Sequence, residues 1–350
     1  MKSKKLRNRK TDHLELCATK EVGFRQKSTL LEEVQLVHQS LPELSLEELD
    51  LSVELLGKRL RAPLIIAAMT GGTRRAGKIN SDLALIAESR GYGLGLGSQR
   101  PMLQEPSKAA SFQVRDQAPT ALILGNIGVA QARECPSRTL ASLVEQIGAD
   151  ALCVHMNPAM ELIQPEGDCD FRGCVDTFAR LVSDLSVPVV AKETGSGLSP
   201  QSVEKLQRAG VEVVDVSGAG GTSWVGVEAL RAQTDESRQL GELLWDWGVP
   251  TAVSVVNAVN ARMTVIATGG IRTGLDAACA LALGAGAVGI ARPVLQAYAR
   301  GGRGSAEAYL VQVQHELEAV MLLCGVRTVA ELRRAPRVIT GKLLEWLSSE

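Results

Sequence analysis

From about residue 60 onward, short apolar runs alternate with longer amphipathic stretches along the chain. Most short runs are rich in β-branched or small apolar residues, and each is followed closely by Gly, Asn, Thr or Ser. This alternation is typical of βαβ units, in which helices connect parallel strands. The runs that we predict to be strands span residues 63–69, 92–97, 120–126, 149–157, 187–193, 211–216, 264–268 and 287–291.

Eight is the number of strands at which a parallel sheet closes into a barrel with its helices outside. We therefore predict an α/β fold, a (βα)8 TIM barrel with an N-terminal extension. The barrel is expected over residues 63–350 and the extension over residues 1–62, and the two form a single domain. Segment 27–56 is dominated by Leu and Glu, and we expect it to cover the barrel or to cross to a neighbouring copy.

Two segments of the barrel region have more than one interpretation. Residues 250–258, PTAVSVVNA, resemble a strand, but a Pro followed by a capping Thr favours the start of a helix between the sixth and seventh strands. Residues 300–304, RGGRG, are predicted to form an exposed loop before a long helix over 306–324. RNA binding by this loop is disfavoured because no aromatic residues lie between the arginines.

Composition and charge exclude several classes of protein. A net charge of -1 gives no general attraction to nucleic acid or to acidic membranes. The seven cysteines are odd in number and include no CxxC pair, so neither a disulfide framework nor a zinc site is predicted. No apolar run has the length of a signal core or of a membrane span, and a reduced, cytoplasmic location is expected.

The candidate chemistry lies where the predicted strands end, because barrel enzymes build their sites beyond the carboxyl ends of the strands. These endings are polar and rich in glycine. They include Met69-Thr70-Gly71-Gly72, Ser98-Gln99-Arg100, Asn126, His155-Met156-Asn157, Lys192-Glu193-Thr194-Gly195 and the Ser217–Thr222 run. The seventh ending, Gly269-Gly270-Ile271-Arg272, and the eighth, Ala291-Arg292, predict a phosphate site formed by backbone N–H groups at a helix N-terminus.

Three interpretations are open for Lys192 at the end of the fifth strand. It could form a Schiff base, take part in a structural ion pair, or place a cation beside an electron-rich cofactor. The hydrogen-bonding groups predicted around it would suit a flavin ring, whose reduced form carries negative charge.

Glu161 comes four residues after the fourth strand ending, His155-Met156-Asn157, and is a candidate Mg²⁺ ligand, although a Glu at the start of a helix often stabilises only that helix. Glu166 and Asp168 add two carboxylates downstream, which could simply stiffen the loop. Near the N-terminus, Arg9, Lys10 and His13 form either a mobile basic arm that closes over a diphosphate or a disordered basic terminus.

Eight motifs in this order resemble the type 2 isopentenyl-diphosphate isomerase family from Arg9 to about Leu295. They are RKxxH, APLxxAxMTGG from Ala62 to Gly72, GSQR, GNIG, HxNPxxExxQPEGD, KETG, SGAGGTSW and TGGIRTGxD. The resemblance implies isomerisation of isopentenyl diphosphate to dimethylallyl diphosphate. It also implies reduced FMN, Mg²⁺, NADPH or another reductant that reduces the flavin, and a homo-oligomer (dimer, tetramer or octamer).

The resemblance also implies roles for particular positions. The FMN positions are Ala68, Met69, Thr70, Ser98, Asn126, Lys192, Ser217, Thr222, Gly270, Ile271, Arg272, Ala291 and Arg292. The substrate positions are Arg9, Lys10, His13, Ser98, Gln99, Arg100, His155, Asn157, Met160 and Trp224, and the metal position is Glu161. His155, Asn157, Met160 and Lys192 are the expected catalytic set.

Met160 departs from the family pattern, which has a glutamine directly before the metal-binding Glu. A thioether can neither relay a proton nor donate a hydrogen bond. Three hypotheses follow: an isopentenyl-diphosphate isomerase, a diverged FMN enzyme (reductase or isomerase) acting on another prenyl or allylic substrate, and a flavin-binding protein without catalysis.

Overall fold

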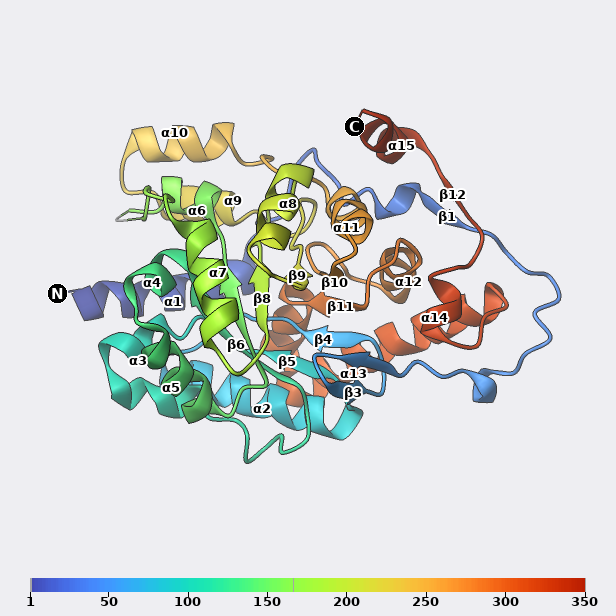
Figure 1. Ribbon diagram of the computed structural model, residues 1–350, viewed down its shortest axis with the longest axis horizontal. Helices are drawn as coiled ribbons and strands as arrows, with labels where there is room; N and C mark the ends of the chain where they lie inside the picture. Colours follow the sequence, from blue (N-terminus) through green and yellow to red (C-terminus); the bar gives the residue numbers. More distant parts are fainter. Residues whose placement is uncertain (1, 166, 350) are drawn as a thin grey trace.

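The computed structural model describes residues 2–165 and 167–349, with side chains described from Lys10 onward. Eight parallel strands form a closed barrel in which the last strand, β11, pairs with the first, β4 (Figure 1). The strands are β4 (Leu64–Ile66), β5 (Gly93–Gly95), β6 (Ile123–Gly128), β7 (Ala151–His155), β8 (Val189–Lys192), β9 (Val213–Asp215), β10 (Thr264–Ala267) and β11 (Ala287–Ile290). All eight predicted strands and the barrel are confirmed.

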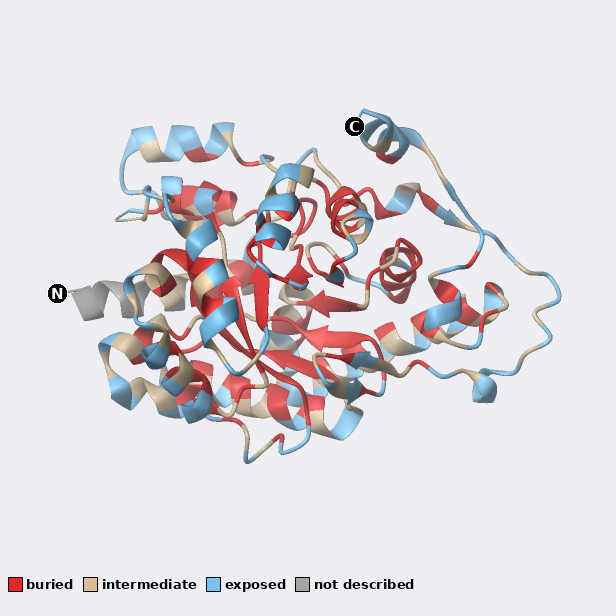
Figure 2. Ribbon diagram, viewed as in Figure 1, coloured by how far each residue is buried: buried red, intermediate tan, exposed pale blue. Residues whose placement is uncertain are grey.

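Helices surround the barrel and carry its exposed surface (Figure 2). They are α2 (Arg74–Arg90), α3 (Arg100–Gln104), α4 (Val129–Glu134), α5 (Ser137–Ile147), α6 (Pro158–Ile163), α7 (Cys174–Asp184), α8 (Pro200–Arg208), α9 (Trp224–Arg231), α10 (Asp235–Leu243), α11 (Thr251–Asn260), α12 (Gly274–Ala282) and α13 (Arg292–Leu323). Helix α11 confirms the helical interpretation of the PTAVSVVNA segment. None of the described helices is long and apolar enough to cross a membrane.

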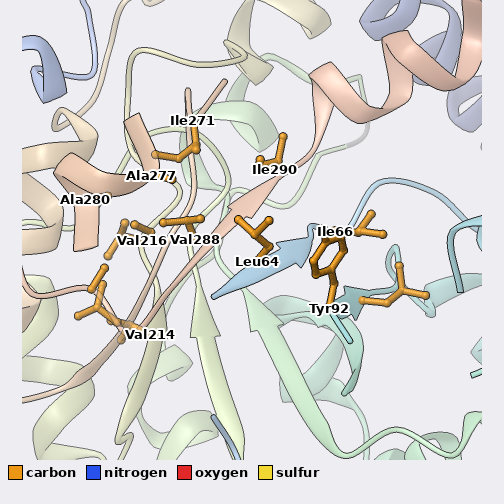
Figure 3. Packing of buried hydrophobic residues seen from close by; sticks show 14 of the residues in the cluster. Leu64, Ile66, Tyr92, Val214, Val216, Ile271, Ala277, Ala280, Val288 and Ile290 are labelled. Atoms are coloured by element: carbon orange, nitrogen blue, oxygen red, sulfur yellow. The ribbon is translucent and has the colours of Figure 1, made fainter. Parts of the chain in front are cut away.

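The barrel strands divide their side chains between two cores, because successive residues of a strand point to opposite faces. Leu64 and Ile66 of β4 belong to the large cluster that fills the space between strands and helices, together with Tyr92, Val214 and Val288 (Figure 3). The intervening residues fill the barrel interior in a second cluster: Ile65, Leu122, Leu124, Ala151, Cys153, Val190, Val213, Ile266 and Ala287.

A hairpin of the N-terminal extension closes one end of the barrel. Strands β2 (Val53–Leu55) and β3 (Lys58–Leu60) pair antiparallel, and Leu55 and Leu60 belong to the interior cluster of the barrel. The connecting Leu56 and Gly57 both have positive φ, 52° and 75°, as a tight hairpin turn requires. This hairpin begins at the end of segment 27–56 and covers the barrel interior.

A segment near the N-terminus pairs with a segment near the C-terminus outside the barrel. Strand β1 (Val34–Leu36) pairs antiparallel with β12 (Arg337–Ile339). Along the chain, β12 lies between the short helices α14 (Val329–Leu332) and α15 (Gly341–Ser348). Helix α1 (Lys2–Thr19) lies against α13 and α9. The disordered terminus is not what the structure has for Lys10–His13: these residues are helical, Lys10 donates to the Ser98 carbonyl, and His13 contacts Glu228.

The predicted exposed loop at 300–304 is confirmed only in part, because it is reduced to a two-residue break between two helical segments. Helix α13 begins at Arg292 and runs to Leu323, and only Gly301 and Gly302 leave helical geometry within it. A Cβ on Gly301 would lie 2.1 Å from the Ser305 hydroxyl oxygen, and Gly302 has a φ of +66°, so glycine suits both positions. The Gly-rich segment is thus a kink that redirects one long helix.

Candidate active site

A cavity of about 450 Å³ lies at the carboxyl ends of the barrel strands, within the range of small-molecule sites. Each of the eight strands, or the loop that follows it, contributes to the wall. Helix α1 supplies Lys10 and His13, and α13 supplies a further side. The cavity is therefore at the position that a TIM barrel uses for its active site.

Most of the predicted site residues surround this one cavity. Those that line it are Lys10, His13, Ala68, Met69, Thr70, Ser98, Arg100, Asn126, His155, Asn157, Met160, Glu161, Lys192, Ser217, Thr222, Trp224, Gly270, Ile271, Arg272, Ala291 and Arg292. The side chain of Arg9 lies outside the described residues, and so does Glu166.

Gln99 is placed differently from its expected role as a substrate contact. It does not line the cavity, and its side chain is fully buried. Its amide nitrogen donates to the Gly97 carbonyl at 2.9 Å, and its amide oxygen accepts from the backbone N–H of Asn126. The expected substrate contact is therefore corrected for Gln99. Its side chain connects the end of β5 to the end of β6 and fixes the backbone of Asn126.

Lys192 forms a buried ion pair at the floor of the site. Its Nζ lies 2.6 Å from Oδ2 of Asp215, and the two side chains are only 10% and 7% exposed. The other carboxylate oxygen of Asp215 accepts from the Thr268 hydroxyl. The structure therefore bears out the ion-pair interpretation of Lys192, and a paired ammonium that lines the cavity is also compatible with a cation beside a cofactor.

His155 and Asn126 form a hydrogen bond across neighbouring strands β7 and β6. The Nδ1–H of His155 donates to the Asn126 side-chain oxygen at 2.7 Å. This bond fixes the ring orientation and the Nδ1 proton. Both side chains line the cavity, so the pair presents an oriented imidazole to a ligand.

Glu161 is buried in helix α6 and held by three donors. Its carboxylate accepts from the Asn157 amide at 3.0 Å, from the Gln164 amide at 3.2 Å and from the backbone N–H of Asp168 at 2.8 Å. Among the described residues there is no group of three or more His, Cys, Asp or Glu side chains that could hold a metal. A cation at Glu161 would therefore take most of its ligands from water and substrate, as Mg²⁺ commonly does.

His13 of helix α1 is locked to the barrel by a buried carboxylate that the sequence analysis missed. Its Nε2–H donates to Glu228 Oε1 at 2.6 Å, and Arg231 binds the other oxygen at 2.5 Å. Burial raises the pKa of Glu228, but His13 and Arg231 outweigh this and hold it below its ordinary value. His13 also packs edge-on against Trp224, with ring centroids 5.2 Å apart.

Arg292 follows the last barrel strand and also anchors helix α1. Its Nε donates to the Cys17 carbonyl at 3.1 Å, and its Nη2 donates to the Lys20 carbonyl at 2.6 Å. These are carbonyls at the C-terminal end of the helix, where a cation is favourable. Arg292, which is predicted to bind phosphate, therefore also has a structural role.

The loops after β9 and β10 pack backbone against backbone at the predicted phosphate end. Gly269 and Gly270 have φ of +94° and +80°. A Cβ on Gly221 would lie 2.3 Å from the Gly270 nitrogen. Ser217 adopts a φ of +36°, an uncommon conformation for a residue with a side chain and one that clusters at ligand sites.

The loop after β8 is organised by Glu193, which is buried beneath the cavity wall. Its Oε2 accepts from the backbone N–H groups of Thr194, Ser196 and Gly197 at 2.5, 2.5 and 3.0 Å. Burial raises the pKa of the Glu193 carboxyl to about 8, although these donors oppose the shift. Thr194 lines the cavity, and its buried hydroxyl has no hydrogen-bond partner among the described residues.

The sequence analysis did not single out Asp215 or Glu228, although the sequence marks both as buried charges. Asp215 interrupts the apolar run VEVVDV, and Glu228 interrupts the apolar helix WVGVEAL. A charge within an apolar element is costly unless it is paired. Each therefore indicated a buried ion pair, although the partner could not be named.

The profile of the FMN-dependent dehydrogenase family matches residues 2–157 and 166–339. An isopentenyl-diphosphate delta-isomerase from Methanosarcina barkeri is 46% identical over 343 residues, which cover 97% of this chain and 93% of the relative. The chain belongs to the type 2 isopentenyl-diphosphate isomerase family. An isopentenyl-diphosphate delta-isomerase from Pyrococcus horikoshii is 42% identical over 348 residues, which cover 97% of this chain and 94% of the relative.

Solved structures outside the isomerases share the fold of this family member. A flavocytochrome b2 mutant has a TM-score of 0.67 at 20% identity, covering 95% of this chain and 82% of that one. A mandelate oxidase mutant with a C4a-OH-FMN adduct has a TM-score of 0.63 at 20% identity, covering 94% and 95%. At this identity the likeness concerns the barrel alone.

The cavity of this isomerase-family chain suits an FMN. One end has the glycine-rich loops after β9 and β10 and the N-terminus of α13, which no side chain caps. The other end has the Lys192–Asp215 pair and the polar groups of Thr70, Ser98 and Asn126. Phosphate fits the first environment and a polar ring edge fits the second.

Proposed function

We propose that this chain isomerises isopentenyl diphosphate to dimethylallyl diphosphate by a 1,3-allylic proton shift. Two observations together support this proposal. The chain shares 46% identity with a curated isomerase over nearly its whole length, and the residues that match the family's motifs surround a single cavity.

FMN would lie across the mouth of the barrel. The loops ending in Gly270, Arg272 and Arg292 would hold its phosphate, and Lys192 would lie beside its ring. Reduced FMN supplies an electron-rich surface and a proton-transferring ring edge to an alkene that no ordinary carboxylic acid protonates readily. NADPH or another reductant would be needed only to bring the flavin to this state.

The substrate diphosphate would be bound between helix α1 and the barrel. Lys10 and Arg100 supply cations there, and His13, held by Glu228, lines the same wall. Glu161 would hold Mg²⁺, which would supply further positive charge for the diphosphate. These groups would neutralise the diphosphate of the substrate, and the hydrocarbon part of the substrate would then lie on the flavin side of the cavity.

The residues around the hydrocarbon end would orient the alkene and exclude water. Trp224 forms an apolar wall beside His13. The oriented His155 ring would hold the substrate through a defined tautomer, and the Lys192 cation would stabilise negative charge on the flavin. Enclosure in low dielectric strengthens these electrostatic effects on a cationic transition state.

Met160 lies in the cavity wall, where its sulfur accepts a weak hydrogen bond from the Asn157 amide at 3.6 Å. The nearby Gln164 amide also lines the cavity but donates to Glu161. We expect Met160→Gln to raise isomerase turnover, because it restores a donor at the family's position. Turnover measured at saturating substrate tests this, and an unchanged rate would mean that the lost amide does not limit the reaction.

The reaction itself tests the proposed function. The purified protein is loaded with FMN, reduced anaerobically with dithionite and given isopentenyl diphosphate and Mg²⁺. Formation of dimethylallyl diphosphate without consumption of reductant is the expected result. Consumption of one reductant per substrate would instead identify the diverged FMN reductase, and no conversion would identify a binding protein without catalysis.

A homo-oligomer and a reduced, cytoplasmic location are part of the same proposal. The location is supported by seven cysteines that are all free. Sedimentation of the purified protein would give the number of copies.

A further inference from the structure

One face of the first half of helix α13 forms part of the cavity wall. Arg292, Gln296 and Arg300 all line the cavity and recur at intervals of four residues. Residues four apart lie on the same side of a helix, and eight residues span about 12 Å along its axis. This face therefore extends from the last barrel strand outward along the predicted phosphate end of the site.

The glycine kink comes directly after Arg300. Gly301 and Gly302 break the helical geometry, and the second half of α13 returns Tyr309 to the same cavity. The Tyr309 hydroxyl donates to the backbone carbonyl of Arg272 at 2.6 Å. The loop after β10 and the two halves of α13 thus share one region of the wall, and Arg300 lies at the bend.

The three arginines of this region differ in what they already bind. Arg292 is engaged by two carbonyls of helix α1. Arg272 makes one long hydrogen bond, 3.4 Å, to the Gly220 carbonyl. No hydrogen bond or ion pair of Arg300 occurs within the described part of the chain, so its guanidinium keeps all its donors for a ligand.

We propose that Arg300 is a further phosphate-binding residue of this site and contacts the phosphate monoester of the bound flavin. The inference rests on the proposed function, because that function places the flavin phosphate at this end. A phosphate monoester carries close to two negative charges, and a guanidinium can bind it through two parallel N–H donors. The Gly-rich segment then serves the site by ending the helix turn that carries Arg300.

Riboflavin provides the direct test, because it has the flavin ring without the phosphate. The ratio of the riboflavin dissociation constant to the FMN dissociation constant measures how strongly the phosphate is bound. For Arg300→Ala we expect FMN binding to weaken about tenfold while riboflavin binding is unchanged. Arg300→Lys should weaken FMN binding less, since it keeps the charge and loses the two-donor geometry.

Arg303 offers a matched control in the same Gly-rich segment. It carries the same charge and is exposed but does not line the cavity. Arg303→Ala should therefore leave the FMN to riboflavin ratio unchanged. An equal loss in Arg300→Ala and Arg303→Ala would overturn the inference, because it would indicate a general electrostatic effect.

Three further outcomes separate this inference from the alternatives. If Arg300→Ala leaves the ratio unchanged but raises the KM for NADPH in flavin reduction, Arg300 binds the phosphates of the dinucleotide and the inference is overturned. If the unsubstituted protein binds no flavin at all, the proposed function fails. If that protein binds FMN and isomerises substrate while the ratio is insensitive to Arg300, only the inference fails.

Discussion

Asp215→Asn tests the buried ion pair at the floor of the site. The substitution keeps the shape of the side chain and an acceptor for the Thr268 hydroxyl, but it removes the negative charge beside Lys192. Both partners are at most one-tenth exposed, with 2.6 Å between the charged atoms. Removing one partner of such a pair leaves an uncompensated buried charge, which costs about 3–5 kcal/mol.

The expected change in melting temperature follows from the size of the chain. An unfolding entropy of about 2.1 cal/mol/K per residue gives roughly 0.7 kcal/mol/K for 350 residues. A loss of about 3–5 kcal/mol therefore lowers the melting temperature by about 4–7 °C. Calorimetry of the flavin-free protein measures this without a contribution from ligand binding.

An exposed ion pair provides the control. Glu204 and Arg208 are paired on the surface of α8, with side chains 57% and 73% exposed. Glu204→Gln should change stability by at most about 0.5 kcal/mol, or less than about 1 °C. If Asp215→Asn lowers the melting temperature by no more than Glu204→Gln does, the reasoning about the buried pair is refuted.

Three other substitutions probe the wall of the cavity. Glu228→Gln should raise the KM for the diphosphate roughly tenfold with less effect on kcat, because His13 loses its charged partner; an unchanged KM would count against the role of helix α1. The pKa of Glu228 is lowered from 4.5, so the ionised carboxylate stabilises the folded protein above pH 4.5 and this stabilisation is lost as the pH falls further. The melting temperature of Glu228→Gln should therefore fall less than that of the unchanged protein when the pH is lowered below 4.5. The pKa of Glu193 is raised from 4.5 to about 8, so the melting temperature should fall as pH rises between these values and should fall less in Glu193→Gln; equal slopes would contradict the raised pKa. Thr194→Val should leave the flavin-free protein as stable as before or more so, since the hydroxyl has no partner, and should weaken flavin or substrate binding by about 1 kcal/mol; unchanged binding of both would mean that the hydroxyl serves neither.

The barrel was predictable because its signal is local and repeated. Runs such as 211–216 and 264–268 each end in polar or glycine residues, and eight of them determine a closed parallel sheet. The strand ends are also the place where the fold requires the site to lie. Membership of the cavity could therefore be assigned to residues such as Asn126 and Lys192 from their positions alone.

The unpredicted features depend on contacts between distant segments. Glu228 meets His13 across 215 residues, and Asp215 meets Lys192 across 23. Gln99 follows its strand as the other site residues do, yet its side chain is directed to backbone groups of the neighbouring strand ends. The Gly-rich segment after Arg300 has the composition of a loop, but only Gly301 and Gly302 leave helical geometry, and helical segments continue on both sides.

A crystal structure of the protein with FMN tests the central claim most directly. The account predicts the phosphate against the loops that follow β10 and β11, with the ring across the barrel mouth beside Lys192. A phosphate bound elsewhere, or side chains filling that mouth in the complex, would contradict it.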